Sequence, residues 1–412
     1  MRILWLSHFV PYPPKGGVFQ RGYNLLTRMA ARHSVQLLAV RHKESTHPQA
    51  ELKIAKAELE RHCQSVEIFD MSARTRPSRL GSLALSALAT GEPLTVRVYD
   101  APGLRETVAR YGAGSIDVVH LDTISLARFL PELNAHPVVL THLGPESLMI
   151  RRRIPFETGL AKRVFFHAEW RLLERYERRV CPAVDLNVTM SRVDRDVLSA
   201  IAPAARFVVV PNGVDTDYFQ SGPVPDTQSL IFAGRLDQYA SLDGIMHFIT
   251  TTWPLVRTRY PAATLTIVGL NPPDVLRSRA SADPQIRLLG YVPDIRPHFR
   301  QAAVSICPLR DGGGTRLKVL DAMALGMPIV TTSMGCEGID VVPEEHVLVA
   351  DTPDAFAAQI GRVLDDKQLR DRLASAARSL AESRYDWDDL ARRLEEAYRS
   401  VLRAPAVGAQ NP

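Results

Sequence analysis

Short apolar segments alternate with longer amphipathic segments along the first half of the chain. The apolar segments predict buried strands at Ile3–Ser7, Val35–Val40, Val66–Phe69, Val118–Leu121, Val138–Thr141, Leu186–Thr189 and Phe207–Val210. Amphipathic stretches between them, such as Val18–Arg32 and Leu52–His62, predict surface helices. A strand followed by a helix and then by another strand is typical of a parallel sheet covered by helices.

The same pattern restarts after an irregular segment, Asp215 to Gln228, in which Asp, Pro and Gly are frequent. The second series predicts strands at Leu230–Ala233, Thr264–Val268, Ile286–Leu288, Val304–Cys307, Ile329–Thr332 and Val347–Ala350. The last predicted helices are Thr352–Leu364, Lys367–Ser383 and Trp387–Arg403. We therefore expect an α/β protein with two Rossmann-like, doubly wound parallel-sheet domains that face a cleft at the carboxyl ends of their strands.

The length and composition agree with two globular domains. A chain of 412 residues exceeds the ~250–300 residues at which one hydrophobic core stops growing. The expected domains are residues 1–212 and 213–385, and the tail at 404–412 has no packing pattern and should be frayed. The four cysteines are scattered, which argues against a disulfide framework or a zinc site.

The start of the chain resembles neither a membrane span nor a signal peptide. No apolar run reaches the ~18 residues that a spanning helix needs. Ser7 and His8 interrupt the apolar start, and no small-residue cleavage site follows soon. We therefore expect a cytoplasmic protein.

The net charge of +5 is concentrated in one stretch. Arg151 to Val180 contains nine Lys or Arg residues against four Asp or Glu residues. This stretch is either a solvated helix face or a surface that attracts an anionic acceptor or anionic lipid headgroups at the inner face of the membrane. No nucleic-acid recognition motif accompanies the charge, so we expect no nucleic-acid partner.

The strongest candidate site lies after the predicted strand that ends at Cys307. A glycine triplet, Gly312 to Gly314, leads into an amphipathic helix that should begin near Thr315. Glycines allow backbone amides to approach an anion, and a helix N-terminus adds favourable partial charge. Arg316 and Lys318 oppose the helix dipole in the first turn, which is tolerable if an anion binds between them. The alternative is an ordinary strand-to-helix turn with surface bases.

Asp321 follows Lys318 by three residues, on the same face of the predicted helix. A carboxylate in this place can accept hydrogen bonds from a ribose diol. Phosphate and ribose contacts so close together indicate a nucleoside diphosphate.

These residues resemble the GT-B retaining glycosyltransferases of family 4, and the subgroup associated with bacterial exopolysaccharide gene clusters in particular. That family has two Glu residues separated by seven positions and then Ala-x-Ala-x-Gly-x-Pro-Val. Asp321 takes the second acidic place, and the segment Ala322–Ile329 matches the family residues that come after it. Gly313 stands in the first acidic place, which the family uses toward the donor sugar. The resemblance covers nearly the whole chain.

The resemblance also assigns a role to Arg235. Ala233–Leu236 is similar to the family's Gly-Arg-Leu, whose arginine contacts the donor pyrophosphate. A lysine usually follows five residues later, but Ala240 stands there. The pyrophosphate would then depend on Arg235, Lys318 and Arg316.

Further donor contacts are implied by the same resemblance. Leu289–Val292 is similar to the stretch that faces the base, and Pro14–Gly17 to the glycine-rich loop that approaches the donor. The complete set of predicted donor-binding residues is Gly17, Gly314, Thr315, Arg316, Asp321, Tyr291 and Val292.

Two residues of the first domain and the last helix complete the comparison. His142 ends a predicted strand where the family often has an active-site histidine, although a lone histidine is commonly structural. Arg21 either lines the acceptor side or is a surface arginine. The helix at 386–403 matches the family's last helix, which packs back on the first domain.

The sequence thus predicts a glycosyltransferase in which His142, Arg235 and Lys318 act in catalysis. The expected reaction moves a sugar with retention from a nucleotide diphosphate sugar to a saccharide or lipid-linked acceptor in cell-surface polysaccharide synthesis. No cofactor is expected, and the three Asp-x-Asp triples do not indicate a metal site. A non-catalytic nucleotide-sugar-binding protein and a sugar-nucleotide epimerase remain alternatives.

Overall fold

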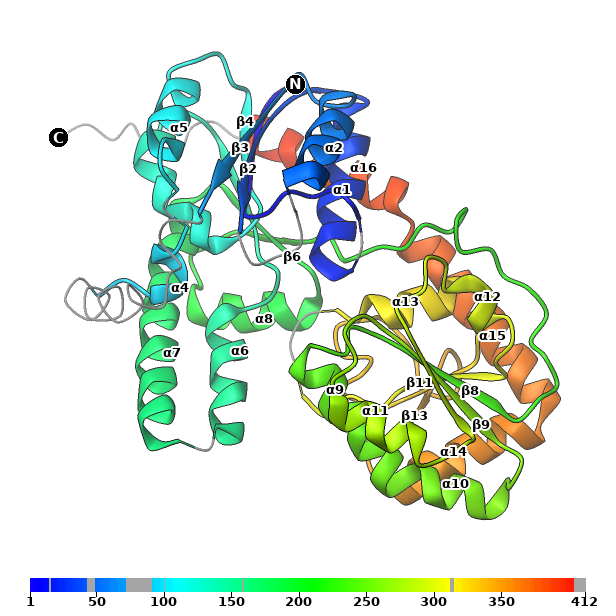
Figure 1. Ribbon diagram of the computed structural model, residues 1–412. Coiled ribbons are helices and arrows are strands. Elements are labelled where there is room, and N and C mark those ends of the chain that lie inside the picture. The colour runs from blue at the N-terminus through cyan, green and yellow to red at the C-terminus, as the bar shows by residue number, and fades with distance from the viewer. Residues whose placement is uncertain are drawn as a thin grey trace. The chain divides into compact units, whose positions relative to one another are not determined.

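The computed structural model describes residues 1–14, 16–42, 49–71, 91–99, 101–157, 159–311 and 315–403. The chain forms two compact units, one of Met1–Pro211 with Leu390–Pro412 and one of Asn212–Asp389. Each unit contains one parallel sheet with helices on both of its faces (Figure 1). The predicted class, two doubly wound parallel-sheet domains, is confirmed. The tail 404–412 lies outside the described residues.

The first unit is built on a seven-stranded sheet in the order β3-β2-β1-β4-β5-β6-β7. Its strands are β1 (Arg2–Ser7), β2 (Ser34–Arg41), β3 (Ser65–Asp70), β4 (Val118–Leu121), β5 (Val138–Thr141), β6 (Leu186–Thr189) and β7 (Phe207–Val209). Its α-helices are α1 (Gly17–Ala30), α2 (Gln49–Glu60), α4 (Leu94–Arg97), α5 (Leu104–Gly112), α6 (Glu146–Arg153), α7 (Leu160–Val180), α8 (Arg192–Ile201) and α16 (Trp387–Arg403). Short 3₁₀ segments are η1 (Ile124–Glu132), η2 (Ile154–Phe156) and η3 (Cys181–Ala183).

The apolar strands of this unit bury both of their faces. Alternate residues of β1 point to opposite sides of the sheet, and all from Ile3 to Leu6 are buried. The last helix, α16, belongs to this unit from Leu390 onward, where Tyr398 and Glu395 fix it. The Tyr398 hydroxyl lies 2.8 Å from Nδ1 of the buried His120, and Arg32 pairs with Glu395 at 3.0 Å.

The second unit is built on a six-stranded sheet in the order β10-β9-β8-β11-β12-β13. Its strands are β8 (Ser229–Ala233), β9 (Thr264–Val268), β10 (Ile286–Gly290), β11 (Val304–Cys307), β12 (Ile329–Thr331) and β13 (Leu348–Val349). Its helices are α9 (Tyr239–His247), the π-helical η4 (Phe248–Thr252), α10 (Trp253–Arg259), α11 (Asp274–Ser281), α12 (Arg296–Phe299), α13 (Leu317–Ala324), α14 (Pro353–Asp365) and α15 (Lys367–Arg384). One core packs α9 to α11 and α14 on one face of the sheet, and a second packs α12 and α13 on the other.

Both sheets reverse their winding direction at their first strand. β1 has β2 on one side and β4 on the other, and β8 likewise stands between β9 and β11. In open α/β sheets, ligands bind outside the carboxyl ends of the two strands at which the order reverses. The topology therefore points to the loops after β1 and β4 in the first unit and after β8 and β11 in the second.

Candidate active site

The loops after β8 and β9 pack backbone against backbone at the carboxyl edge of the second sheet. The Gly234 amide donates to the Val268 carbonyl at 3.0 Å, and the Gly269 amide donates to the Gly290 carbonyl at 2.9 Å. A Cβ added to Gly269 would overlap the Gly234 carbonyl oxygen, so this approach requires a glycine. The loop that carries Gly234 is therefore fixed close to the ends of two neighbouring strands.

Lys318 reaches across the point where the sheet order reverses. It lies in the first turn of α13, after β11, and its Nζ donates to the Ser241 hydroxyl at 3.0 Å, on α9 after β8. Nζ also lies 4.7 Å from the centre of the Phe232 ring. If residue 234 had a side chain, its Cβ would lie 2.5 Å from Nζ of Lys318. The ammonium group therefore packs directly against the backbone of Gly234. Burial lowers the pKa of Lys318, and the charge of Arg316 acts in the same direction.

Two helices begin at this edge. α9 starts at Tyr239 behind the loop after β8, and α13 starts at Leu317 with Arg316 as its N-cap residue. The first amides of a helix have no partner within the helix, and they favour an anion together with the helix dipole. The helix predicted to begin near Thr315 thus begins two residues later. Positive side chains and helix N-termini together suit a diphosphate.

Asp321 and Thr315 carry buried oxygen atoms that lack a hydrogen-bond partner within the described ranges. Asp321 is 8% exposed, and its Oδ1 has no partner; the same holds for Thr315 Oγ1. Burial raises the pKa of Asp321 to about 7. No hydrogen bond or ion pair between described residues joins its carboxyl group to Lys318 or Arg235. Buried polar atoms are normally satisfied, so these two oxygens indicate donors that a ligand would supply.

The guanidinium group of Arg235 is paired with the side chain of Asp237. Its Nε and NH2 donate to the two oxygens of Asp237 at 3.1 and 2.8 Å, and Asn271 donates to the same carboxylate at 3.4 Å. The hydrogen bond to Asp237 raises the pKa of Arg235 and lowers that of Asp237. A diphosphate would have to compete with Asp237 for this guanidinium group.

The remaining predicted donor residues lie around this edge or outside the described residues. Tyr291, directly after β10, is 51% exposed, and Val292 packs against the core beneath it. Both follow a strand that is separated from β8 by β9. Gly314 lies outside the described residues.

His142 of the first unit is a buried histidine with a partner. Its side chain is almost fully enclosed, and Nε2 donates to the Asn187 side-chain oxygen at 2.9 Å. The Asn187 amide group donates in turn to the Cys181 carbonyl at 2.8 Å. Burial lowers the pKa of His142 to about 4, so the ring is neutral at physiological pH.

The other two predicted residues of the first unit both lie on α1. Gly17 is its first residue, and a Cβ there would meet no atom within 4 Å, whereas Gly16 before it has φ 90° and needs a glycine. Arg21 is buried and donates to the Pro211 carbonyl at 2.7 Å. Burial lowers the pKa of Arg21 to about 10. Arg21 is therefore not a solvated surface arginine.

The sequence patterns missed the partner of Lys318 and a polar cluster of the first unit. Ser241 has no motif around it and is found only through its contact with Lys318. His8 and Asp122 directly follow β1 and β4, the two strands at which the first sheet reverses, and they contact each other at 2.7 Å. The strand order of a doubly wound sheet would have been sufficient to predict their proximity.

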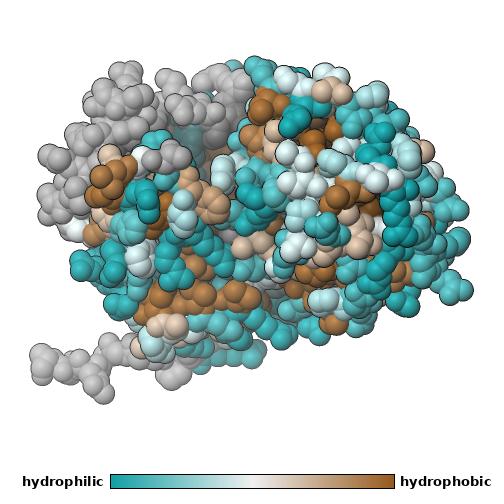
Figure 2. Space-filling view, turned by 90° about the horizontal axis from the view of Figure 1, so that it is seen from below, coloured by the Kyte–Doolittle hydropathy of each residue, from teal (hydrophilic) through white to brown (hydrophobic). Residues whose placement is uncertain are grey.

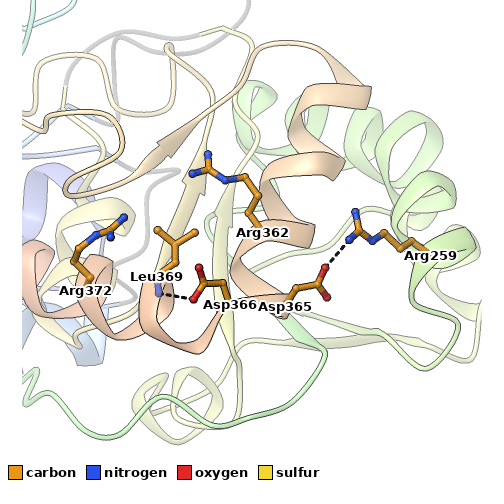
Figure 3. A pocket seen from close by; sticks show the side chains of 6 residues that line it. All are labelled: Arg259, Arg362, Asp365, Asp366, Leu369 and Arg372. Atoms are coloured by element: carbon orange, nitrogen blue, oxygen red, sulfur yellow. Dashed lines mark hydrogen bonds and ion pairs between the residues drawn. The ribbon is translucent and has the colours of Figure 1, made fainter.

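A pocket of about 330 Å³ lies elsewhere in the second unit (Figure 3). It is lined by Arg259, Arg362, Asp365, Asp366, Leu369 and Arg372. Arg259 ends α10, which precedes β9, so the pocket is at the amino edge of the sheet. Arg259 pairs with Asp365 at 2.5 Å and Arg362 with Glu344 at 2.8 Å. Because carboxylates already neutralise these cations, the pocket is a poor candidate for the nucleotide.

No group of three or more His, Cys, Asp or Glu side chains in the described ranges is placed to hold a metal ion. Among the helices that the structure describes, none has the length and apolar character to cross a bilayer.

Comparisons with known proteins show the family. A family model described as Glycosyltransferase Family 4 matches residues 15–218, and one described as Glycosyl transferases group 1 matches residues 227–366. The chain belongs to the family 4 glycosyltransferases of the GT-B fold. The resemblance seen in the sequence is thereby confirmed, and so is the expectation of a glycosyltransferase.

Two relatives in Mycobacterium tuberculosis are about a quarter identical to this family 4 glycosyltransferase over the residues that align. A phosphatidyl-myo-inositol mannosyltransferase is 26% identical over 328 residues, which cover 75% of this chain and 81% of the relative. A GDP-mannose-dependent alpha-(1-6)-phosphatidylinositol monomannoside mannosyltransferase is 27% identical over 248 residues, 54% of this chain and 63% of the relative.

Solved structures show the same fold as this family 4 glycosyltransferase. A sucrose-phosphate synthase from Thermosynechococcus elongatus matches with a TM-score of 0.71 and 16% identity, over 98% of this chain and 100% of the other. Anabaena HepE in complex with UDP matches with a TM-score of 0.66 and 18% identity, over 97% and 100%. At these identities the similarity shows the fold alone.

Proposed function

We propose that this glycosyltransferase takes its sugar from a nucleoside diphosphate sugar bound at the ends of β8 and β11. The observation that carries the proposal is Lys318, whose Nζ lies against the Gly234 backbone and Ser241 between the N-termini of α9 and α13. The diphosphate would bind there, and the unpartnered carboxyl oxygen of Asp321 would receive the ribose diol.

Lys318 and Arg235 would stabilise the negative charge that develops on the leaving phosphates. Fixed cations and helix N-termini supply this stabilisation without a metal ion. Gly314, Thr315 and Arg316 would line the phosphates. We propose that the reaction retains the anomeric configuration, as the family resemblance implies.

Four further contacts are carried over from the family. Tyr291 and Val292 would face the base, and Gly17 would approach the donor from the first unit. His142 would contact the donor sugar, for which its neutral ring and its bond to Asn187 would have to be rearranged.

For the substrates, we propose a GDP-sugar donor and a lipid-linked or saccharide acceptor in the synthesis of a cell-surface polysaccharide or glycolipid. Both mycobacterial relatives are named as mannosyltransferases of phosphatidylinositol lipids, and one as GDP-mannose-dependent. They match this chain at 26% and 27% identity, whereas the UDP-bound structure matches at 18%. The sequence relatives therefore weigh more in the choice of donor.

A panel of nucleotide sugars tests the proposed donor. Thermal unfolding would be measured with GDP-mannose, UDP-glucose and UDP-N-acetylglucosamine, since a ligand that binds the folded state raises the melting temperature by mass action. We expect GDP-mannose to give the largest rise and to be turned over with a phosphatidylinositol acceptor, with the anomeric configuration read by NMR. No stabilisation by any of the three would contradict the proposed donor site, and an inverted product would contradict retention.

We propose that the enzyme contacts anionic lipids through α6 and α7, a position at the inner face of the cytoplasmic membrane. Five large apolar side chains of these helices and their connection are exposed, among them Leu160 at 79% and Val164 at 61%. Figure 2 shows hydrophobic residues gathered between hydrophilic ones in the left part of the view, where the lower ends of α6 and α7 face the viewer. Exposed apolar residues mixed with basic ones suit the lipid–water interface.

The surface charge of this pair of helices is more positive than its sequence suggests. Glu169 is buried and accepts the Leu94 and Thr95 amides at 3.0 and 2.9 Å. Glu177 is buried and accepts the Ser147 amide at 3.0 Å. Because both carboxylates are buried and bind backbone amides, they contribute little to the charge of the surface. Basic residues of the same helices, such as Arg151 and Arg153, are exposed.

Reversal of the charges of Arg151, Arg152 and Arg153 to Glu should strongly reduce sedimentation with anionic vesicles. Each basic residue near an anionic surface contributes about 1 kcal/mol, and the effect should weaken as salt rises. The control reverses Arg277, Arg279 and Arg300 of the second unit, which changes the net charge equally. If both variants lose binding equally, or if the unaltered enzyme ignores such vesicles at low salt, the helices are only a solvated face.

A further inference from the structure

A buried carboxylate holds a histidine ring at the carboxyl edge of the first sheet. His8 follows β1, and Asp122 follows the neighbouring strand β4. Nδ1 of His8 lies 2.7 Å from Asp122 Oδ1, and the same oxygen accepts the His8 amide at 3.0 Å. The Ser7 hydroxyl donates to Asp122 Oδ2 at 2.6 Å. Ser7 and His8 thus supply the hydrogen bonds to both carboxylate oxygens of Asp122.

This arrangement leaves one edge of the ring available. With Nδ1 donating to Asp122, the neutral ring carries its lone pair on Nε2. Nε2 has no hydrogen bond to another described residue and is not among their buried unpartnered atoms; the side chain is 13% exposed. The other contacts of the ring are aromatic, with Phe9 at 4.5 Å and Tyr99 at 5.9 Å between ring centres. An oriented hydrogen-bond acceptor thus faces solvent at the place where the sheet reverses.

Further polar groups lie around the ring. Glu146, at the start of α6 after β5, accepts a hydrogen bond from the Thr123 hydroxyl at 3.2 Å, and burial raises its pKa. Arg21 lies near enough to Asp122 for their charges to interact. His42 donates from Nε2 to the His8 carbonyl at 3.0 Å, which fixes the backbone below the ring. A polyhydroxylated ring would find several hydrogen-bond partners here.

We propose that His8, oriented by Asp122, binds the attacking hydroxyl group of a sugar or cyclitol acceptor. The proposal rests on the proposed function. In the transfer, the bond between the anomeric carbon and the phosphate oxygen breaks with its electron pair, and the acceptor oxygen bonds to that carbon. The acceptor proton passes along its hydrogen bond to Nε2 of His8, where Asp122 stabilises the imidazolium that forms, and from there to solvent. His8 accepts the hydrogen bond of this hydroxyl, which strengthens as the oxygen becomes more acidic in the transition state, so that the lone pair of the oxygen faces the anomeric carbon.

His8→Asn tests the proposal because the shorter amide can still donate to Asp122 but lacks the far nitrogen. We expect kcat/KM for the acceptor to fall by roughly 10- to 100-fold, as for the loss of one oriented hydrogen bond. Binding of GDP and hydrolysis of the donor by water, both measured without acceptor, should change less than about twofold. His136→Asn is the matched control, because His136 bonds two backbone carbonyls at the opposite edge of the same unit.

Asp122→Asn provides a second, independent variant. The amide oxygen would still accept from the His8 backbone amide and from Nδ1, and the amide nitrogen would donate to the Ser7 hydroxyl, so the ring stays oriented and loses only the negative charge beside it. We expect a smaller loss of kcat/KM for the acceptor than in His8→Asn, and no further loss in the double variant. Equal loss of transfer and donor hydrolysis, or unchanged kcat/KM for the acceptor in His8→Asn, would overturn the role of His8. If the unaltered enzyme transfers sugar to no acceptor, the proposed function itself fails.

Discussion

Replacement of Lys318 by Met should weaken the binding of the nucleoside diphosphate by roughly 10- to 150-fold, or about 1.5–3 kcal/mol. Met keeps the apolar stem that packs over Phe232 and removes only the ammonium group that faces Gly234 and Ser241. The melting temperature without ligand should stay the same or rise, because burial disfavours the lysine charge. Calorimetric titration with GDP and thermal unfolding measure the two effects.

Lys367→Met is the control for this prediction. Lys367 is exposed on α15 and pairs with Asp371 at 2.6 Å, so its loss removes one positive charge from the same unit far from the candidate site. GDP affinity should be unaltered in this variant. Equal affinities in all three proteins would remove Lys318 from the phosphate site.

Replacement of Asp321 by Asn should stabilise the protein without ligand at pH 8. Asp321 is buried, and no other charge offsets the burial that raises its pKa from 3.8 to about 7. The folded state therefore holds this proton more tightly than the unfolded state. Its contribution to stability is fully present below pH 3.8 and is lost as the pH rises to about 7. Asn does not titrate, so the free energy of unfolding of the variant does not fall in this way over the same pH range.

The gain in Asp321→Asn should reach roughly 4 kcal/mol above pH 7 and shrink toward pH 4, by the linkage relation. Unfolding by urea at pH 5 and pH 8, in both proteins, measures it. The control is Asp371→Asn, an exposed carboxylate on α15, which should show no such pH-dependent gain. A gain that is the same at both pH values would mean that Asp321 is not a destabilising buried acid. Functional residues often cost stability in this way.

The strands could be predicted closely from the sequence, because short, continuous apolar runs between amphipathic helices are typical of a parallel sheet that is buried on both faces. Val118–Leu121, Val138–Thr141 and Leu186–Thr189 coincide with β4, β5 and β6. The start of α13 was predicted two residues early, because the pattern of a helix does not reveal that Arg316 adopts an extended N-cap conformation.

Side-chain partners were harder to predict, since they depend on residues far away in the sequence. The motif around Arg235 does not show that its guanidinium group pairs with Asp237. The strand end at His142 does not show that the ring donates to Asn187, on the neighbouring strand. Conversely, His8 and Asp122 are 114 positions apart and meet only because β1 and β4 are adjacent. The proposed nucleotide site follows from a local motif, whereas the proposed acceptor-side cluster required the sheet order.

The central claim, a nucleotide site in which Asp321 receives the ribose, is tested most directly by four affinities. GDP and 2′-deoxy-GDP would each be titrated into the unaltered enzyme and into Asp321→Asn at pH 8, where the carboxyl group is mostly ionised. A ribose diol gives a carboxylate two charge-assisted hydrogen bonds, and a deoxyribose gives only one. We predict that loss of the 2′-hydroxyl costs the unaltered enzyme roughly tenfold in affinity and the variant less than about threefold. An equal penalty in both proteins would contradict the account.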